Sequence, residues 1–191
     1  MAEAVEAQEA ALKAELAEKR IAQAEINRLA YYDGLTNLPN RALLMDRLGL
    51  ALAVAQRQGH IDALVLFNLD RFKILNDAHG HHMGDLLLIA VGGRLASLLR
   101  EGDTLARLAA DEFAILLQDI DAQRESASRR AISVAEKIHA CMRLPFALEP
   151  DKETTLTASL GITLSPESDA DAPQDILRRA DTALHRAKDA G

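Results

Sequence analysis

The sequence predicts an α+β fold, in which helices flank a mainly antiparallel central sheet and a further helix precedes it. Three observations predict this architecture. Residues 1–30 contain neither Gly nor Pro and are rich in Ala, Glu and Lys. After them, helical and strand-like apolar patterns alternate, and the central order is the βαββαβ of ferredoxin-like folds. Hydrophobic residues make up 49% and charged residues 27% of a 191-residue chain, which is typical of a globular domain with a full core.

Residues 1–30 are predicted to form one exposed signalling helix. Glu9/Lys13 and Glu15/Lys19 are i,i+4 pairs in the favourable order. The thin apolar stripe of this helix favours a weak coiled coil, and thus a homodimer. The alternative is a solvated helix whose partner domain lies elsewhere.

The remaining elements follow from local patterns. Turn formers predict a loop at 33–40, and a continuous apolar run at 63–67 predicts a buried strand. Asp85 is expected to open a long helix, because residues 79–85 have the composition of a turn. Helices are expected at 40–58, 124–143 and 173–188, and a short helix is expected to lead to Asn76 and Asp77. Strands are expected at 104–108 and 112–118, around a turn at 109–111. Strand-like segments are expected at 144–149 and 154–164, around a polar turn at 150–153.

Composition excludes several classes of function. A net charge of −7 and a pI near 5.4 argue against nucleic acid as the main partner. Cys141 is the single cysteine, so no disulfide forms within one chain. No apolar run has the length of a membrane span, and the N-terminus lacks a signal pattern. We expect a cytoplasmic protein, or the cytoplasmic part of a larger one.

The run RLAADEF at 107–113 is the strongest indication of chemistry. Two adjacent acids in a turn between strands can hold a divalent metal against a phosphate. In the predicted topology the ends of the strands converge. Asn68 and Asp70 should therefore lie near Asp111 and Glu112.

Four further motifs surround this turn: DGLTNLPNR at 33–41, NLDRFKILND at 68–77, GHHMGD at 80–85 and ADTALHRAK at 180–188. Together they resemble the GGDEF family, the diguanylate cyclases that make cyclic di-GMP from two GTP molecules. The resemblance implies a nucleotidyl-cyclase-like fold for a GGDEF domain at 31–191. The family's second basic residue would follow Lys188 by three or four positions, so we expect either that the domain is truncated at its C-terminus or that this cation is missing. The residues of the first two motifs are similar to those of GGDEF domains that are fused to an EAL phosphodiesterase domain.

The resemblance also implies a metal site. Asn68, the Leu69 carbonyl and Asp111 would hold Mg²⁺ or Mn²⁺, and Glu112 would act as the second catalytic acid, near the attacking hydroxyl. Asn68 stands where the family has an aspartate. Because an amide carries no charge, we expect weakened metal binding.

The substrate contacts are also implied by the resemblance. Asn76 and Asp85 match the guanine-binding pair, and amide and carboxylate groups can read guanine by hydrogen bonds. The backbone around Phe72, with Lys73 and Lys188, matches the phosphate contacts. Without the resemblance, Asn76 and Asp85 would be ordinary helix-end residues.

Ala109 and Ala110 stand where the family has glycines. If this turn needs a positive φ, each alanine costs roughly 1–2 kcal/mol. Their methyl groups also take space that glycine leaves for GTP. Together with Asn68, they predict very low or absent cyclase activity.

A second ligand site is implied at Arg100 and Asp103, which match the family's inhibitory RxxD site for cyclic di-GMP. Arginine can grip a phosphate and a guanine edge, and aspartate can accept from guanine. Arg129 or Arg130 is a candidate second arginine. The alternative is an Arg at a helix end followed by a turn Asp.

Three functions remain open at this point. The leading one is a degenerate GGDEF domain that binds GTP, cyclic di-GMP or both as a regulatory module. The others are a working diguanylate cyclase, and a structural linker that passes a signal to an EAL-type domain. The histidines of residues 79–82 are expected to face solvent rather than to bind a metal.

Overall fold

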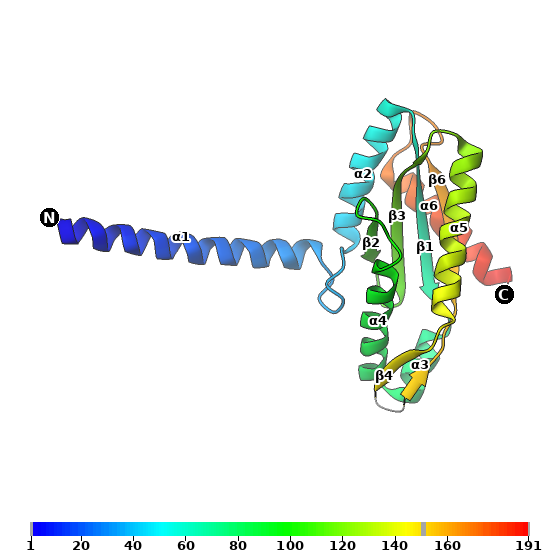
Figure 1. Cartoon of the computed structure of the whole chain (residues 1–191), viewed down its shortest axis with the longest axis horizontal. Coiled ribbons are helices and arrows are strands. Elements are labelled where there is room, and N and C mark those ends of the chain that lie inside the picture. Colours follow the sequence, from blue (N-terminus) through cyan, green and yellow to red (C-terminus); the bar gives the residue numbers. More distant parts are fainter. Residues whose placement is uncertain (1, 150–151, 191) are drawn as a thin grey trace.

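The structure is a computed structural model that describes residues 2–149 and 152–190, with side chains for 12–148 and 153–190. Helix α1, Ala2–Tyr31, projects away from the remainder of the chain as one long rod (Figure 1). The predicted N-terminal helix is therefore confirmed. The predicted Glu9/Lys13 pair falls outside the residues whose side chains are described.

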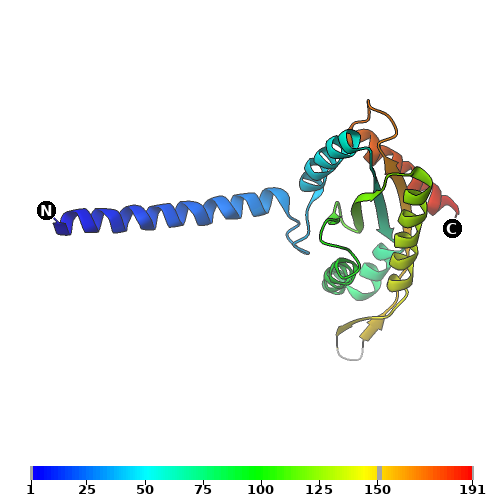
Figure 2. The same cartoon turned by 45° about the horizontal axis from the view of Figure 1, so that its top comes forward.

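Five further helices and six strands make up the domain (Figures 1 and 2). In chain order they are α2 Arg41–Gln58, β1 Ile61–Leu69, α3 Phe72–His79, α4 His81–Ala96, β2 Thr104–Arg107, β3 Glu112–Asp121, α5 Arg124–Met142, β4 Phe146–Glu149, β5 Lys152–Thr154, β6 Ala158–Ser165 and α6 Pro173–Ala190.

The main sheet has the strand order β2-β3-β1-β6, and every neighbouring pair is antiparallel. This arrangement confirms the predicted βαββαβ core. Strand β1 lies in the middle, and its residues 62–67 are buried. A central strand covered on both faces has no polar side to show, which explains its continuous apolar run.

Helices cover both faces of the sheet. On one face, α4 and α5 pack on Val65 and Phe67 of β1, and Phe67 stacks on Phe113 of β3 with ring centroids 5.3 Å apart. On the other face, α2 and α6 pack on Leu64 and Leu66. The alternation of β1 side chains between two separate cores fixes its register, because a slip of one residue would exchange the two faces.

Two predicted boundaries were wrong. Helix α4 begins at His81, four positions before Asp85, because Gly80 alone, at φ 85°, reverses the chain between α3 and α4. The expected strand 154–164 corresponds to β6, which begins only at Ala158 and joins the main sheet. Strand β5, Lys152–Thr154, lies largely in the expected turn 150–153 and pairs with β4 in a small separate sheet. The Asp70 amide donates to the Thr157 carbonyl (2.9 Å), which continues the β1–β6 register by one pair beyond Leu69 and Ala158.

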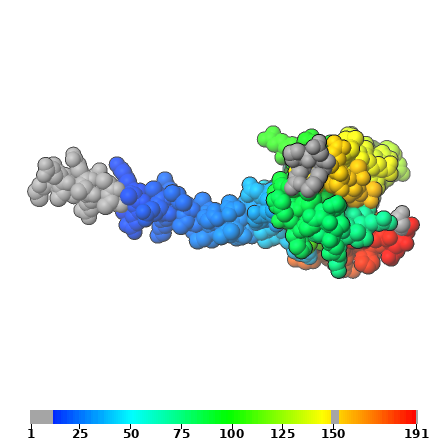
Figure 3. All heavy atoms as spheres, turned by 90° about the horizontal axis from the view of Figure 1, so that it is seen from below, coloured from blue at the N-terminus to red at the C-terminus, as the bar shows by residue number. Residues whose placement is uncertain are grey.

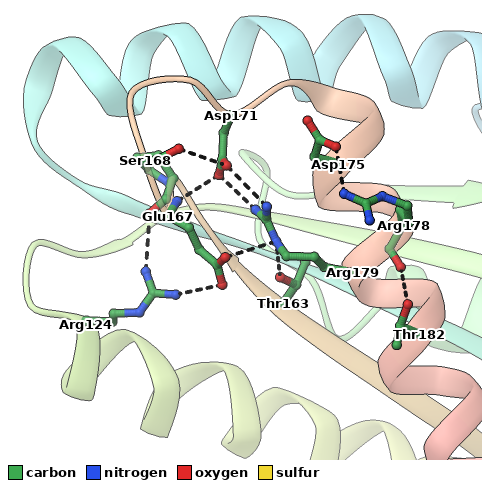
Figure 4. Close-up of polar contacts among 10 residues, drawn as sticks. Arg124, Thr163, Glu167, Ser168, Asp171, Asp175, Arg178, Arg179 and Thr182 are labelled. Carbon is green, nitrogen blue, oxygen red and sulfur yellow. Dashed lines mark hydrogen bonds and ion pairs between the residues drawn. The ribbon is translucent and has the colours of Figure 1, made fainter.

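The loop from β6 to α6 is closed by an ion-pair network (Figure 4). Arg179 of α6 donates to both carboxylate oxygens of Asp171 (2.8 and 3.2 Å) and lies 3.5 Å from Glu167. Glu167 also pairs with Arg124 at the start of α5. A bidentate Arg–carboxylate pair has a defined geometry, so the network orients α6, which carries Lys188. In the part of the chain that is described, no helix is long and apolar enough to cross a membrane.

Candidate functional site

The hairpin between β2 and β3 brings the two predicted acids to the end of β1. Asn68 and Glu112 are directly opposed partners in the β1–β3 ladder, and the Leu69 amide donates to the Asp111 carbonyl (3.1 Å). The structure therefore gathers Asn68, Leu69, Asp111 and Glu112, as the topology predicted. Asp70 turns away from them, because its carboxylate accepts hydrogen bonds from Thr157 (2.6 Å) and Ser159 (2.7 Å).

The expected backbone strain at Ala109 and Ala110 is absent. Among the described residues other than glycine, a positive φ occurs at Asn37, Arg71 and Asp119, and not at either alanine. The connection from Arg107 to Glu112 is four residues long, so it closes without the left-handed conformations that a two-residue turn requires. Both alanines are exposed, and the remaining argument against activity at this point is the space taken by their methyl groups.

Arg107 ties the hairpin tip to the loop that follows α1. Its guanidinium donates to the Asp33 carboxylate (2.8 Å) and to the Ala110 carbonyl (2.8 Å). The same Asp33 oxygen accepts from the amide and hydroxyl of Thr36. Burial raises the pKa of Asp33, but the Thr36 and Arg107 contacts outweigh it and hold the pKa below its usual range. The N-terminal helix and the tip are therefore linked through one ion pair.

The predicted guanine contacts lie on the two helices α3 and α4. Asn76 packs against Gly84, where a β-carbon would lie 1.9 Å from the Asn76 side-chain oxygen. This oxygen is buried and has no hydrogen-bond partner among the described residues. Asp85 follows Gly84 and is exposed. A buried amide that lacks a partner beside an exposed carboxylate is suited to a ligand with both donors and acceptors, such as a guanine edge.

Basic side chains lie on either side of the strand end. Lys73 is exposed in the first turn of α3, just after the buried Phe72. Lys188 near the end of α6 lines a cavity of about 990 Å³ together with Asn68 and Arg71. These cations can neutralise phosphate charge next to the acids of the tip.

Glu112 faces a different hollow, of about 450 Å³, between α2 and α6. Burial and the neighbouring Asp181 raise the pKa of Glu112, while Arg41 and Lys188 act in the opposite direction. The environment of this acid is thus set by α2 and α6, the two helices that cover the same face of the sheet.

The donor set fits a divalent metal only weakly. An amide oxygen, a backbone carbonyl and one carboxylate are the hard oxygen ligands that Mg²⁺ accepts. However, this set carries one negative charge where an aspartate at position 68 would give two. No group of three or more His, Cys, Asp or Glu side chains is placed to hold a metal in the part of the chain that the structure describes.

Comparison with known proteins identifies the family. A family model described as "Diguanylate cyclase, GGDEF domain" matches residues 30–191. The chain belongs to the GGDEF family. It is 42% identical over 170 residues to MucR of Pseudomonas aeruginosa, a bifunctional diguanylate cyclase/cyclic di-GMP phosphodiesterase, covering 89% of this chain and 24% of that protein. It is 38% identical over 165 residues to the diguanylate cyclase TpbB of the same species, covering 86% and 37%. The chain therefore spans much less than two thirds of these relatives.

Solved GGDEF structures have the same fold. The GGDEF domain of TpbB matches with a TM-score of 0.77 and 38% identity, covering 84% of this chain and 90% of that one. The coiled coil and GGDEF domain of DgcB from Caulobacter crescentus, in complex with c-di-GMP, matches with a TM-score of 0.85 and 27% identity, covering 98% and 95%. The latter match includes the long N-terminal helix, because it covers nearly the whole chain.

The predicted inhibitory pair of this GGDEF domain lies at the other end of the β2–β3 hairpin. Arg100 and Asp103 are joined to each other (3.2 Å), and Arg100 also donates to the carbonyls of Gln118 and Asp119 in β3. Of the two candidate companions, Arg130 donates to the Ile120 carbonyl (2.6 Å), and Arg129 is exposed on the same helix. The polar groups at this end therefore already contact one another.

Two residues of the site were missed by sequence reasoning. Arg107 opens the RLAADEF run but was given no role, and Arg41 was treated only as the start of a helix. The Arg107–Asp33 contact spans 74 positions, and no local pattern indicates such a pair. The histidines predicted to face solvent, His79, His81 and His82, are all exposed.

Proposed function

We propose that this GGDEF domain binds GTP at the tip of the β2–β3 hairpin as a regulatory module and has little or no cyclase activity. The observation that carries the proposal is the opposition of Asn68 and Glu112 across the ladder. The two acids next to the strand end could hold a metal-bound phosphate, while Asn68, at the position of the family's first aspartate, carries no charge. Asn76, Asp85, Lys73 and Lys188 would still contact the nucleotide.

Mg²⁺ or Mn²⁺ would be held by Asn68, the Leu69 carbonyl and Asp111, and would neutralise the phosphates when bound. Losing one carboxylate weakens such a site, because divalent ions in proteins gain much of their affinity from ligand charge. The methyl groups of Ala109 and Ala110 reduce the room for the nucleotide further.

The test compares nucleotide binding with turnover. Calorimetry should detect GTP binding in the presence of Mg²⁺, and chromatography should detect little or no cyclic di-GMP. Asn68→Asp, alone and with Ala109→Gly and Ala110→Gly, should tighten Mg²⁺–GTP and raise product formation. Asn27→Asp makes the same charge change on α1, away from the site, and should do neither. Product formed by the unmodified protein at an ordinary enzyme rate would refute the proposal.

Cyclic di-GMP at Arg100 and Asp103 is a second candidate ligand. It is favoured by the adjacency of these two side chains at an exposed turn and by the DgcB relative, whose structure holds c-di-GMP. In this chain, binding there would have to replace the contacts that Arg100 makes to Asp103 and β3.

The projecting helix suggests how the module communicates. Large apolar side chains of α1 are exposed, among them Leu12, Leu16, Ile26 and Leu29. We propose that two copies pair through this helix, and that the Asp33–Arg107 contact passes its position to the tip. The length of MucR suggests that sensor or EAL domains accompany the module. Sedimentation of the unmodified chain and of Leu16→Glu tests the pairing. We expect a dimer that Leu16→Glu disrupts, and an unmodified chain that sediments as a monomer would contradict the proposal.

A further inference from the structure

The cavity that Lys188 lines together with Asn68 and Arg71 extends well beyond the predicted GTP contacts. It measures about 990 Å³ and lies between α3, the β5–β6 link and the end of α6. Figure 3 shows the molecule from below, with α3 in turquoise, α4 in green and α6 in red, while the described residues next to the grey segment are yellow to orange. Neither the guanine contacts nor Arg100 and Asp103 line it, so most of its wall has no role in the function proposed above.

One wall of the cavity is basic. Arg71, Lys188 and Arg143 line it, and each of these side chains belongs to an exposed residue. The single described carboxylate in the lining is Asp70, whose two oxygens accept hydrogen bonds from Thr157 and Ser159. In a chain whose net charge is −7, three cations facing one hollow favour an anionic ligand there.

Another part of the lining is apolar. Ile74, Leu75, Ala78 and Leu156 contribute to it, and Ile74 remains 64% exposed although it is a large hydrophobic residue. A bare phosphate ion would use none of this surface. A planar base covering it would gain free energy from the apolar area removed from water.

Hydroxyl groups complete the lining, because Thr154 and Thr155 face the hollow from the β5–β6 link. Ribose and base edges need such donors and acceptors. Basic, hydroxyl and apolar walls around one cavity are the combination that a nucleoside phosphate requires, and the volume is large enough for one.

We propose that this cavity binds a nucleoside monophosphate, distinct from GTP at Asn76 and Asp85, with its phosphate on the Arg143 wall and its base against Ile74. Lys188 borders both sites, so ligands in the two would influence each other. The site does not depend on GTP binding, because Arg143 and Ile74 lie outside the predicted GTP contacts.

Calorimetric titration of the full chain with GMP tests the proposal. Removing a charged hydrogen-bond donor should weaken GMP binding about tenfold or more in Arg143→Gln, and Ile74→Asp should weaken it similarly. Arg57→Gln, the same change at an exposed residue in the last turn of α2 and outside the cavity lining, should leave it unchanged. Asn76→Ala should also leave GMP binding intact while reducing GTP binding, which separates this site from the proposed function.

Three results would overturn the inference. The first is no detectable GMP binding by the unmodified protein. The second is GMP binding that Asn76→Ala abolishes, which would place GMP in the GTP site. The third is pyrophosphate binding as tightly as GMP with no effect of Ile74→Asp, which would leave a simple anion site. Circular dichroism and thermal melting confirm that each variant is folded.

Discussion

The two ends of the β2–β3 hairpin carry similar polar residues but satisfy them differently. In the proposed GTP site beside the tip, Asn76 of α3 keeps a buried oxygen without a described partner, and Asp85, Lys73 and Lys188 are exposed. At the far end, Arg100, Asp103, His60, Asp62 and Asp119 contact one another. The residues of the proposed GTP site, which we call the open end, can accept a ligand without losing contacts. A ligand at the far end of the hairpin, which we call the closed end, must first replace contacts that these residues already make. The comparison predicts tighter nucleotide binding at the tip.

The largest effect should come from filling the open end. In Gly84→Ala, the added β-carbon would lie 1.9 Å from the Asn76 oxygen, so Asn76 must leave its position. We expect GTP affinity to fall by roughly tenfold to a hundredfold, because hydrogen bonds of the guanine are lost. Gly93→Ala on the same helix meets nothing within 4 Å and is the matched control. Equal GTP affinities for the two variants would show that Asn76 does not contact the nucleotide.

The next effect concerns the ion pair that supports the tip. The Arg107 side chain is 11% exposed and that of Asp33 is 24% exposed, so Asp33→Asn leaves a largely buried guanidinium without its carboxylate. We expect a loss of about 2 kcal/mol in the free energy of unfolding at neutral pH. Asp46→Asn, the same change in α2, provides the control in chemical denaturation.

The pH dependence of this loss follows from the sign of the pKa shift. The folded-state pKa of Asp33 is lowered, so its contribution is present above the unfolded pKa and disappears as the pH falls through the folded one. The difference between wild type and Asp33→Asn should therefore begin to shrink near the unfolded pKa, at about pH 4, and vanish only below the lowered folded-state pKa. A difference that persists in acid would mean that packing, and not charge, explains the variant.

At the closed end the sign reverses. Asp62 is fully buried, one of its oxygens has no described partner, and Ser165, opposite it on β6, has an equally unpaired hydroxyl. Burial raises the pKa of Asp62 despite the Asp119 amide hydrogen bond and the nearby His60, so ionised Asp62 costs stability above the folded pKa.

Replacing this carboxyl should therefore stabilise the protein. We expect Asp62→Asn to gain on the order of 1 kcal/mol at neutral pH, since the amide can donate to Ser165 and carries no charge. The gain should shrink as the pH falls and wild-type Asp62 takes up a proton. Asp119→Asn, a change at an exposed residue of β3, should have little effect, and thermal melting between pH 4 and pH 8 measures both. Destabilisation at neutral pH would show that the charge of Asp62 is needed there.

The contrast between the two ends also shows what sequence can reveal. The β1 strand was predictable because burial on both faces leaves a continuous apolar run, and the gathering of Asn68 with Glu112 followed from topology. The pairing of Asp33 with Arg107 was not, because the two residues are 74 positions apart. Nor was the negative φ of Ala109 and Ala110, because it depends on the length of the loop rather than on the residues in it.

The smallest effect should be seen in cyclic di-GMP binding at the closed end. The Arg100 guanidinium already bonds to Asp103, Gln118 and Asp119, so a ligand replaces contacts instead of adding them. We expect weak binding in calorimetry that Arg100→Ala removes and Arg186→Ala, an exposed change on α6, does not. Because Arg100 also bonds to β3 when no ligand is bound, Arg100→Ala should lower the melting temperature of the ligand-free protein slightly. Cyclic di-GMP could instead bind more tightly here than GTP binds at the tip. Existing contacts among the polar groups would then not limit ligand affinity, and the distinction between the two ends would be wrong.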